Sequence, residues 1–200
     1  METVLEKPDA QVNMGKWLSN AWDLIFNDLG FFLLITIIYI AIISVASSTI
    51  IGEFIVVGPM TVGYFYIIFQ KMRGKEVQLG DLSKGFNFFA AAVLSNILIT
   101  IFVTVGFLFL ILPGIVVMAL YLFAPAFILE HNMDFWQAME ASRKVATNHL
   151  FELSVFVFLL GLILTLGVLA CLVGLLIATP LCLAAIAFAY DDLVGLKQEE

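Results

Sequence analysis

The stretch FFLLITIIYIAIISVASS at residues 31–48 decides the fold, because it contains no Asp, Glu, Lys, Arg or His. The hydrocarbon core of a bilayer is roughly 30 Å thick and takes about 20 apolar residues of helix to cross. The strands of a membrane β-barrel would alternate apolar and polar residues, whereas this stretch is apolar on every side. In lipid, a continuous helix satisfies its own backbone hydrogen bonds. The stretch therefore predicts a transmembrane helix.

Five further stretches share this character, so the sequence predicts an all-α fold: a polytopic helical membrane bundle with six transmembrane helices. Very short links join the spans in pairs, which makes three hairpins. The chain has 200 residues, of which 62% are hydrophobic and 12% charged, about half the charged fraction of soluble domains. This composition excludes a water-soluble protein. The predicted spans are about 31–48, 51–69, 88–112, 114–129, 150–170 and 172–190.

Around these spans, the sequence predicts a polar N-terminal tail at 1–14, a single transmembrane domain at 15–190 and an acidic C-terminal tail at 191–200. Every Lys and Arg falls in the tails or in the two longer links between hairpins. Because Lys and Arg are retained on the cytoplasmic side, we expect both termini in the cytoplasm. The net charge of −7 belongs to a face of mixed sign, which argues against nucleic acid as a partner.

Short amphipathic segments precede the hairpins. Trp22 and Ile25 share one side of the first segment at helical spacing, and Met139 and Val145 share one side of the third. A weaker version at 81–86 precedes the middle hairpin. We expect each segment to form a short interfacial helix that either only anchors the spans or also senses anionic lipid. The basic candidates for contact with lipid headgroups are Lys71, Arg73, Arg143 and Lys144.

The hairpins also share a pattern that predicts an internal repeat. An Asn opens each hairpin, a Pro follows, and a Gly follows the Pro in the first and third hairpins at identical spacing. The middle hairpin matches if Pro125 is aligned with Pro59, with extra residues around 112–114. Because Asn and Pro are common at helix ends and kinks, chance stays an alternative. The matching residues are Asn27, Pro59 and Gly74, then Asn87 and Pro125, then Asn148, Pro180 and Gly195.

Polar chemistry inside the predicted spans is sparse. Asn96, Thr100 and Thr104 lie at helical spacing, and they are the candidates for an intramembrane polar face. Asn96 either joins two helices inside the bundle or lines a substrate path. No ionisable residue sits in the middle of a span, where transporters and membrane enzymes usually place one.

Near the predicted inner interface, one group of residues has the side chains needed for acid and base catalysis or metal binding. It comprises Glu130, His131, Asp134 and His149. Their spacing matches no metal or catalytic motif. We therefore predict no catalytic residue, no metal site and no cofactor, and interpret the group as a helix cap with solvated charges.

Several motifs resemble a broad bacterial family of six-span membrane proteins, which includes the membrane domain attached to some glycerophosphodiester phosphodiesterases. The motifs are LPGI at 112–115, APAFILE at 124–130, WQAMEASRK at 136–144, GPM at 58–60 with Gly63, and KMRGK at 71–75. The resemblance covers most of the chain from about residue 15 onward and implies a bacterial inner-membrane location. It implies no catalytic residue, because catalysis in such phosphodiesterases belongs to a separate soluble domain.

Our leading hypothesis is a non-enzymatic accessory, assembly or envelope-related membrane protein. The expected partners are membrane lipids and either a membrane protein or further copies of the chain. The alternative is a small-molecule transporter or channel formed by three parallel hairpins, with Asn96, Thr100 and Thr104 along its path. A third hypothesis, an intramembrane lipid enzyme, requires Glu130 and the two histidines to converge.

Overall fold

A computed structural model describes residues 7, 11–170 and 173–197 of the chain, and this part is all-α, without strands. Six stretches of helix within it are long and apolar enough to cross a membrane, which confirms the predicted class. The helices are α1 (Met14–Asn27), α2 (Leu29–Ala46), α3 (Ile50–Met72), the 3₁₀ helix η1 (Leu79–Phe88), α4 (Phe89–Phe109), α5 (Ile111–Leu120), α6 (Ala124–His131), α7 (Phe135–Asn148), α8 (Leu150–Leu169) and α9 (Leu175–Leu193).

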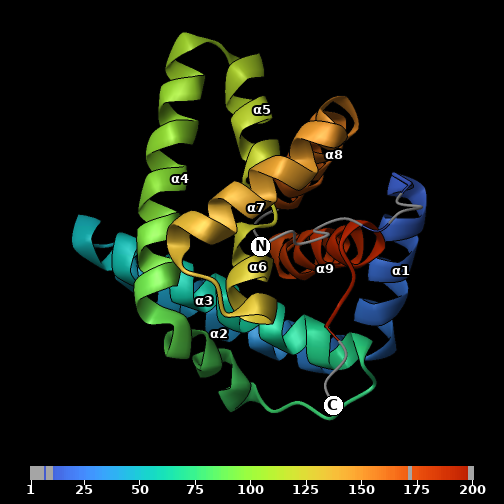
Figure 1. Ribbon diagram of the computed structural model, residues 1–200. Coiled ribbons are helices and arrows are strands. Elements are labelled where there is room, and N and C mark those ends of the chain that lie inside the picture. Colours follow the sequence, from blue (N-terminus) through green and yellow to red (C-terminus); the bar gives the residue numbers. More distant parts are fainter. Residues whose placement is uncertain (1–6, 8–10, 171–172, 198–200) are drawn as a thin grey trace.

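The six spans form three hairpins, α2 with α3, α4 with α5 and α6, and α8 with α9. The hairpins diverge. In Figure 1, α4 and α5 rise to the top, α2 and α3 cross the lower part, and α9 is seen nearly along its axis. The turn of each hairpin, which we call its tip, is thus separated from the other two tips. The opposite ends, which we call the bases, meet at the centre of the molecule.

A helix directly precedes each hairpin, and these three leading helices α1, η1 and α7 close the bases into a ring. Each leading helix packs on the hairpin before its own: η1 on α3, and α7 on α4, α5 and α6. The first leading helix, α1, packs on α9 of the last hairpin. The hairpins touch in the same order, α3 with α4, α5 with α8, and α9 with α2. The first and last helices therefore meet and complete the ring.

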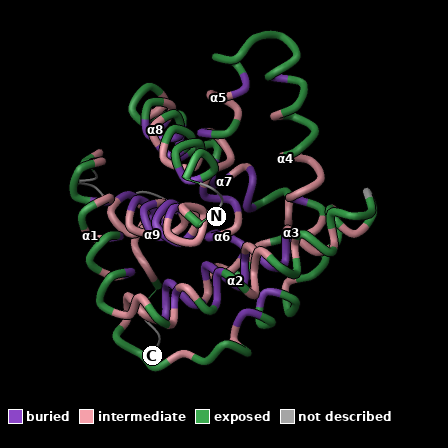
Figure 2. Tube along the Cα trace, turned by 180° about the vertical axis from the view of Figure 1, so that it is seen from behind, coloured by how far each residue is buried: buried purple, intermediate pink, exposed green. Residues whose placement is uncertain are grey.

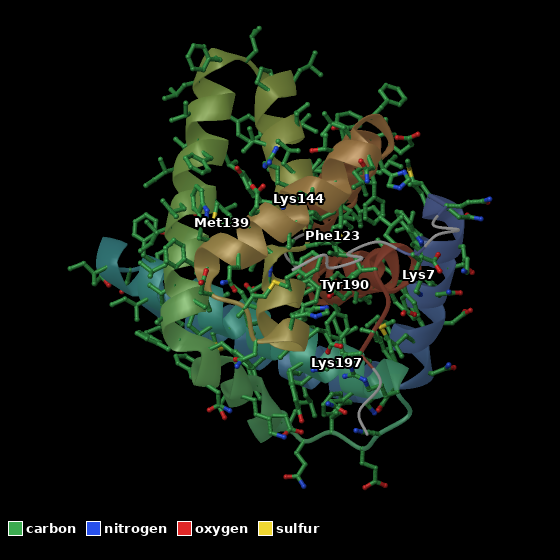
Figure 3. The ribbon with its side chains drawn as sticks, viewed as in Figure 1. Lys7, Phe123, Met139, Lys144, Tyr190 and Lys197 are labelled. Atoms are coloured by element: carbon green, nitrogen blue, oxygen red, sulfur yellow. The ribbon has the colours of Figure 1, made fainter. Side chains whose placement is uncertain are left out.

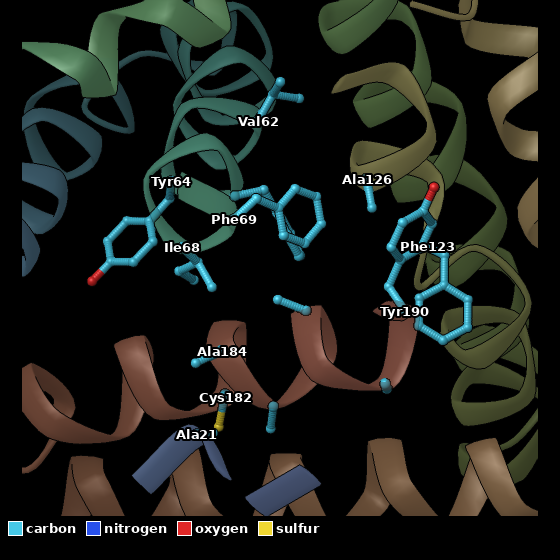
Figure 4. Packing of buried hydrophobic residues seen from close by; sticks show 14 of the residues in the cluster. Ala21, Val62, Tyr64, Ile68, Phe69, Phe123, Ala126, Cys182, Ala184 and Tyr190 are labelled. Atoms are coloured by element: carbon cyan, nitrogen blue, oxygen red, sulfur yellow. The ribbon is translucent and has the colours of Figure 1, made fainter. Parts of the chain in front are cut away.

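Aromatic side chains from the last helix of each hairpin, which is α3, α6 or α9, form the centre of the core. The ring of Tyr190 on α9 lies 5.7 Å from that of Phe69 on α3 and 5.2 Å from that of Phe127 on α6. In Figure 4, Tyr190 lies beside Phe123, and Ile68 points from α3 toward α9. All these side chains are buried. Burial of such large apolar groups favours the association of the three bases.

The last helices of the three hairpins end with the same backbone conformation. Gly74 follows α3, Asn132 follows α6 and Gly195 follows α9, and each has a positive φ. A residue in this left-handed conformation lets the chain turn back and satisfy the last carbonyl groups of the helix. Glycine takes the conformation without steric cost, and Asn tolerates it better than most residues. Phe69, Phe127 and Tyr190 each lie five positions before these residues, so the aromatic centre occupies the same place in all three hairpins.

The hairpin tip between α4 and α5 is apolar and exposed. Leu108 is 80% exposed and Leu112 is 73% exposed at the tip between α4 and α5. Figure 2 shows this tip in the exposed class, while buried residues gather where the bases meet. Figure 3 shows only carbon in the side chains at this tip, at the top of the view. Such apolar surface is expected where lipid is the solvent.

The fourth predicted span, 114–129, lies within the candidate span Ile111–His131, but a turn interrupts its helix, which the sequence analysis did not predict. Helix α5 ends at Leu120 and α6 begins at Ala124, and Pro125 lies in the first turn of α6. In contrast, Pro59 and Pro180 lie inside α3 and α9. The alignment of Pro125 with Pro59 is therefore wrong. A proline in the first turn removes no helical hydrogen bond, because the N–H groups there have no partner in the helix.

The sequence predictions also differ from the structure at other boundaries. Helix α3 extends to Met72 and α9 to Leu193, so the last span runs into the predicted C-terminal tail. Cys171 and Leu172 in the turn of the third hairpin lie outside the described residues, as do positions 1–6 and 8–10 of the predicted N-terminal tail and 198–200 of the predicted C-terminal tail. On α1 the buried face is Trp17, Ala21 and Ile25, while Trp22 of the predicted stripe is 49% exposed.

Ser142 of α7 holds the break between α5 and α6. Its hydroxyl donates to the Leu120 carbonyl at 2.8 Å and accepts from the Phe123 N–H at 3.1 Å. Ser142→Ala leaves both buried backbone groups without this partner, so we expect it to lower the free energy of unfolding by about 1–3 kcal/mol. Thr147→Ala on the same helix is the control, since its exposed hydroxyl only returns to the Arg143 carbonyl. Thermal unfolding in detergent measures both, and equal effects would contradict this role for Ser142.

Candidate functional site

A polar pocket of about 250 Å³ opens at the hairpin bases between α3, η1, α6 and the C-terminal tail. Segments far apart in the sequence build it, because the ring brings the ends of α3, α6 and α9 together. Three cations and one carboxylate are among its walls. The polar lining residues are Tyr66, Gln70, Arg73, Lys84, Asn87, Glu130 and Lys197.

An ion pair between Arg73 and Glu130 forms the inner wall of this basal pocket. The Arg73 guanidinium lies 2.6 Å from the Glu130 carboxylate, and their side chains are only 15% and 5% exposed. The tail closes over the pair: the Lys197 N–H donates to Glu130 at 2.9 Å, and Arg73 donates to the Lys197 carbonyl at 3.0 Å. A charge-assisted network of this kind fixes the position of each group.

Lys84 of η1 forms the opposite wall. Its ammonium donates to the Tyr66 hydroxyl at 2.8 Å and lies 2.9 Å from Asp81, one turn earlier. The ammonium also lies 4.5 Å from the centre of the Tyr66 ring. These contacts hold a second cation in the lining of the basal pocket.

Two glycines bring η1 close enough to α3 for these contacts. A Cβ atom on Gly85 would overlap the Pro59 carbonyl oxygen and the backbone of Gly63. A Cβ atom on Gly63 would overlap the Leu82 carbonyl oxygen. Only glycine fits at both positions, because the two backbones touch directly. The distance from Lys84 to Tyr66 thus depends on this pair.

The candidate headgroup contacts Lys71 and Arg73 both lie at the end of α3, but only Arg73 lines the basal pocket. Lys71 forms an ion pair with Asp28 and lies 5.0 Å from the centre of the Phe31 ring. It therefore joins the end of α3 to the start of α2. These contacts of Lys71 link two helices of the first hairpin.

The other two candidates, Arg143 and Lys144, lie on the exposed face of α7. Arg143 donates two hydrogen bonds to Glu140, at 2.7 and 2.8 Å. These bonds lower the pKa of the Glu140 carboxyl below its ordinary value, so it stays ionised beside Arg143. Lys144 lies 3.8 Å from the same carboxylate, with its side chain 60% exposed. The structure does not bring this pair to the basal pocket.

The candidate polar face on α4 does not line a common space. Asn96 borders a cavity of about 50 Å³ together with Thr61 and Ser95, which is room for one or a few water molecules. Thr100 and Thr104 are exposed on the outer side of the helix. These positions give no support to a continuous polar path.

The acid and base candidates are also dispersed. Glu130 and His131 end α6, whereas His149 lies beyond α7, a helix of 14 residues that is about 21 Å long. Asp134 caps α7 by accepting from the Gln137 N–H at 2.9 Å, as predicted. Among the residues that the structure describes, no three of His, Cys, Asp and Glu are placed to hold a metal ion.

Sequence reasoning missed most of the basal pocket. Lys84, Asn87 and Lys197 were not among the predicted site residues, and Glu130 was assigned to a different hypothesis. A signal for Lys84 exists, since Asp81 precedes it by one helical turn and Gly85 follows it. The contribution of Lys197 depends on the tail folding back over α6, which no local pattern indicates.

The chain was compared with models of protein families, with curated proteins and with solved structures. None of the three comparisons gives a match. The functional argument therefore depends on the geometry of the chain itself.

Proposed function

We propose that the protein is a non-enzymatic accessory, assembly or envelope-related protein of the bacterial inner membrane, with both termini in the cytoplasm. Its working surface is the ring of hairpin bases, which lies at the cytoplasmic interface. The observation that carries the proposal is this ring: three leading helices, with the basal pocket at its rim.

Exposed aromatic residues support an interfacial position for the ring. Trp22 stacks on Phe26 on the outer side of α1, with ring centres 4.0 Å apart. Phe86 and Phe89 are exposed around the end of η1, and Trp136 is exposed on α7. Helices that lie in the membrane interface place Trp, Phe and Leu at the boundary between headgroups and acyl chains. One such group on each leading helix would hold the whole ring at that depth.

The distribution of cations supports the orientation. Each Lys and Arg of the chain lies at the hairpin bases, on α1, at the end of α3, on η1, on α7 or in the tails. The turns of the hairpins carry no charged residue in the sequence, and Glu53, near the turn of the first hairpin, is the nearest charged residue to one of them. Cations retained on one side of a membrane identify that side as the cytoplasm.

Native mass spectrometry of the protein extracted with its surrounding lipids tests the proposal. We expect the protein to retain an anionic lipid or a partner subunit reproducibly, because the ring presents basic and aromatic groups at headgroup depth. Digestion with a non-specific phospholipase should remove the lipid signal but not a subunit. A bare monomer that carries a small polar metabolite would contradict the proposal and favour transport.

A further inference from the structure

We propose that the basal pocket is a binding site for a phosphate group, held between Lys84 and Lys197 beside the Arg73–Glu130 pair. The phosphate is that of an anionic lipid headgroup or a free phosphate ion, which share this chemistry. The inference rests on the proposed function, because a lipid headgroup reaches the pocket only if the hairpin bases lie at the membrane surface.

Charge is the first argument. Arg73, Lys84 and Lys197 line the basal pocket, against the single carboxylate of Glu130. Asp81 also faces Lys84, at 2.9 Å, but it is not part of the lining. The interior thus carries an excess of positive charge although the chain has a net charge of −7. An excess of fixed cations in a cavity with low-dielectric walls favours an anion there.

The neutral donors give the second argument. Asn87 offers amide N–H groups, and the Tyr66 hydroxyl, which accepts from Lys84, keeps its own hydrogen to donate. Phosphate oxygens accept several hydrogen bonds at once, and Lys and Arg are the usual cations that bind them. The volume of about 250 Å³ lies just below the range of roughly 300–1,000 Å³ that holds drug-sized ligands. It therefore fits a small polar group.

Position gives the third argument. Phe88 lines the basal pocket, and the exposed Phe86 of η1 and Phe89 of α4 lie close to it in the chain. If these rings lie at the boundary between headgroups and acyl chains, as Phe and Trp of interfacial helices do, the pocket lies at the level of lipid phosphates. The tail segment up to Lys197 is held at the pocket by its backbone bonds to Arg73 and Glu130.

The test uses the full chain in phosphatidylcholine nanodiscs, with phosphatidylglycerol or phosphatidic acid titrated in and bound lipid counted by native mass spectrometry. The variant is Lys84→Gln with Lys197→Gln. The Lys197 substitution keeps the bonds of the tail, because they use its backbone. The matched control is Lys16→Gln with Lys75→Gln, which removes the same charge outside the pocket. A second arm measures binding of inorganic phosphate to the same proteins.

We expect the preference for anionic lipid over phosphatidylcholine to fall about tenfold or more in the pocket variant, since each charged hydrogen bond lost corresponds to about that factor. The control should keep the preference. A variant with Lys84→Arg in place of Lys84→Gln should recover part of the preference that the pocket variant loses. If only the phosphate arm shows the loss, the ligand is the free ion. Equal binding by wild type and pocket variant in both arms would overturn the proposal, as would an equal loss in the control.

The two proposals fail separately. If the pocket variant behaves as wild type while the natural extract still retains a lipid or a subunit, the pocket assignment is wrong and the function stands. Size-exclusion profiles and melting temperatures of all variants identify any loss that comes from unfolding.

Discussion

Replacement of Gly85 by alanine is expected to destabilise the protein by about 3 kcal/mol, the upper end of the usual cost of overpacking. The added Cβ atom would overlap the Pro59 carbonyl oxygen and the backbone of Gly63. Backbone atoms cannot move aside as a flexible side chain does, so η1 must separate from α3. The basal pocket then loses the contact of Lys84 with Tyr66. Thermal unfolding and size-exclusion chromatography in detergent measure the loss.

Gly161→Ala is the matched control, because a Cβ atom at that position on α8 meets nothing within 4 Å. Alanine is the better helix former by roughly 0.5–1 kcal/mol, so the control should unfold at the same temperature or slightly higher. If Gly85→Ala unfolds at the same temperature as this control, the close approach of η1 and α3 is not a feature of the protein in solution.

Replacement of Arg73 by methionine is expected to cost about 3–5 kcal/mol, because it leaves Glu130 charged and buried without its partner. The Glu130 side chain is 5% exposed and its nearest cation is Arg73, at 2.6 Å. The tail should loosen as well, since Arg73 also binds the Lys197 carbonyl. Hydrogen exchange of the tail amides and the free energy of unfolding measure the two effects.

The double variant Arg73→Met with Glu130→Met decides the cause. Without either charge, the burial cost disappears, and the double variant should be more stable than Arg73→Met alone. Lys16→Met is the control for loss of an exposed pair, its partner being Asp192 at 2.8 Å, and should cost less than about 1 kcal/mol. If the losses of unfolding free energy in Arg73→Met and in Glu130→Met add up to the loss in the double variant, the ion pair contributes nothing to stability.

The sequence was sufficient for the class of fold, because solvation determines it. A stretch such as residues 31–48 has no charge to place in water, and short links leave only hairpins. The same apolarity conceals the packing order. Lipid is as apolar as leucine, so the composition of a span does not identify its neighbours. The divergence of the hairpins and the contact of α1 with α9 could not be predicted for this reason.

Local interruptions escaped prediction for a different reason. The break between α5 and α6 falls at Tyr121, Leu122 and Phe123, and its one local signal is Pro125 in the first turn of α6, which is also compatible with a kink inside a continuous span. It is stabilised from outside by Ser142, whose partners lie about twenty positions earlier in the chain. The basal pocket has the same character: Arg73, Glu130 and Lys197 meet only after the ring has closed. Pattern reasoning finds contacts within one helix, and these contacts join three.

The central claim, that the hairpin bases face the cytoplasm while the tips do not, is tested most directly by cysteine accessibility. Single cysteines at Lys75 and Lys144 of the bases, and at Ser48 and Leu110 of two tips, are introduced after Cys171→Ala and Cys182→Ala. A membrane-impermeant thiol reagent is then applied to intact spheroplasts and to inverted membrane vesicles. We expect the base positions to react only in inverted vesicles, and the tip positions to react only in spheroplasts or to be protected by lipid. Reaction of either base position in intact spheroplasts, or of a tip position in inverted vesicles alone, would contradict the account.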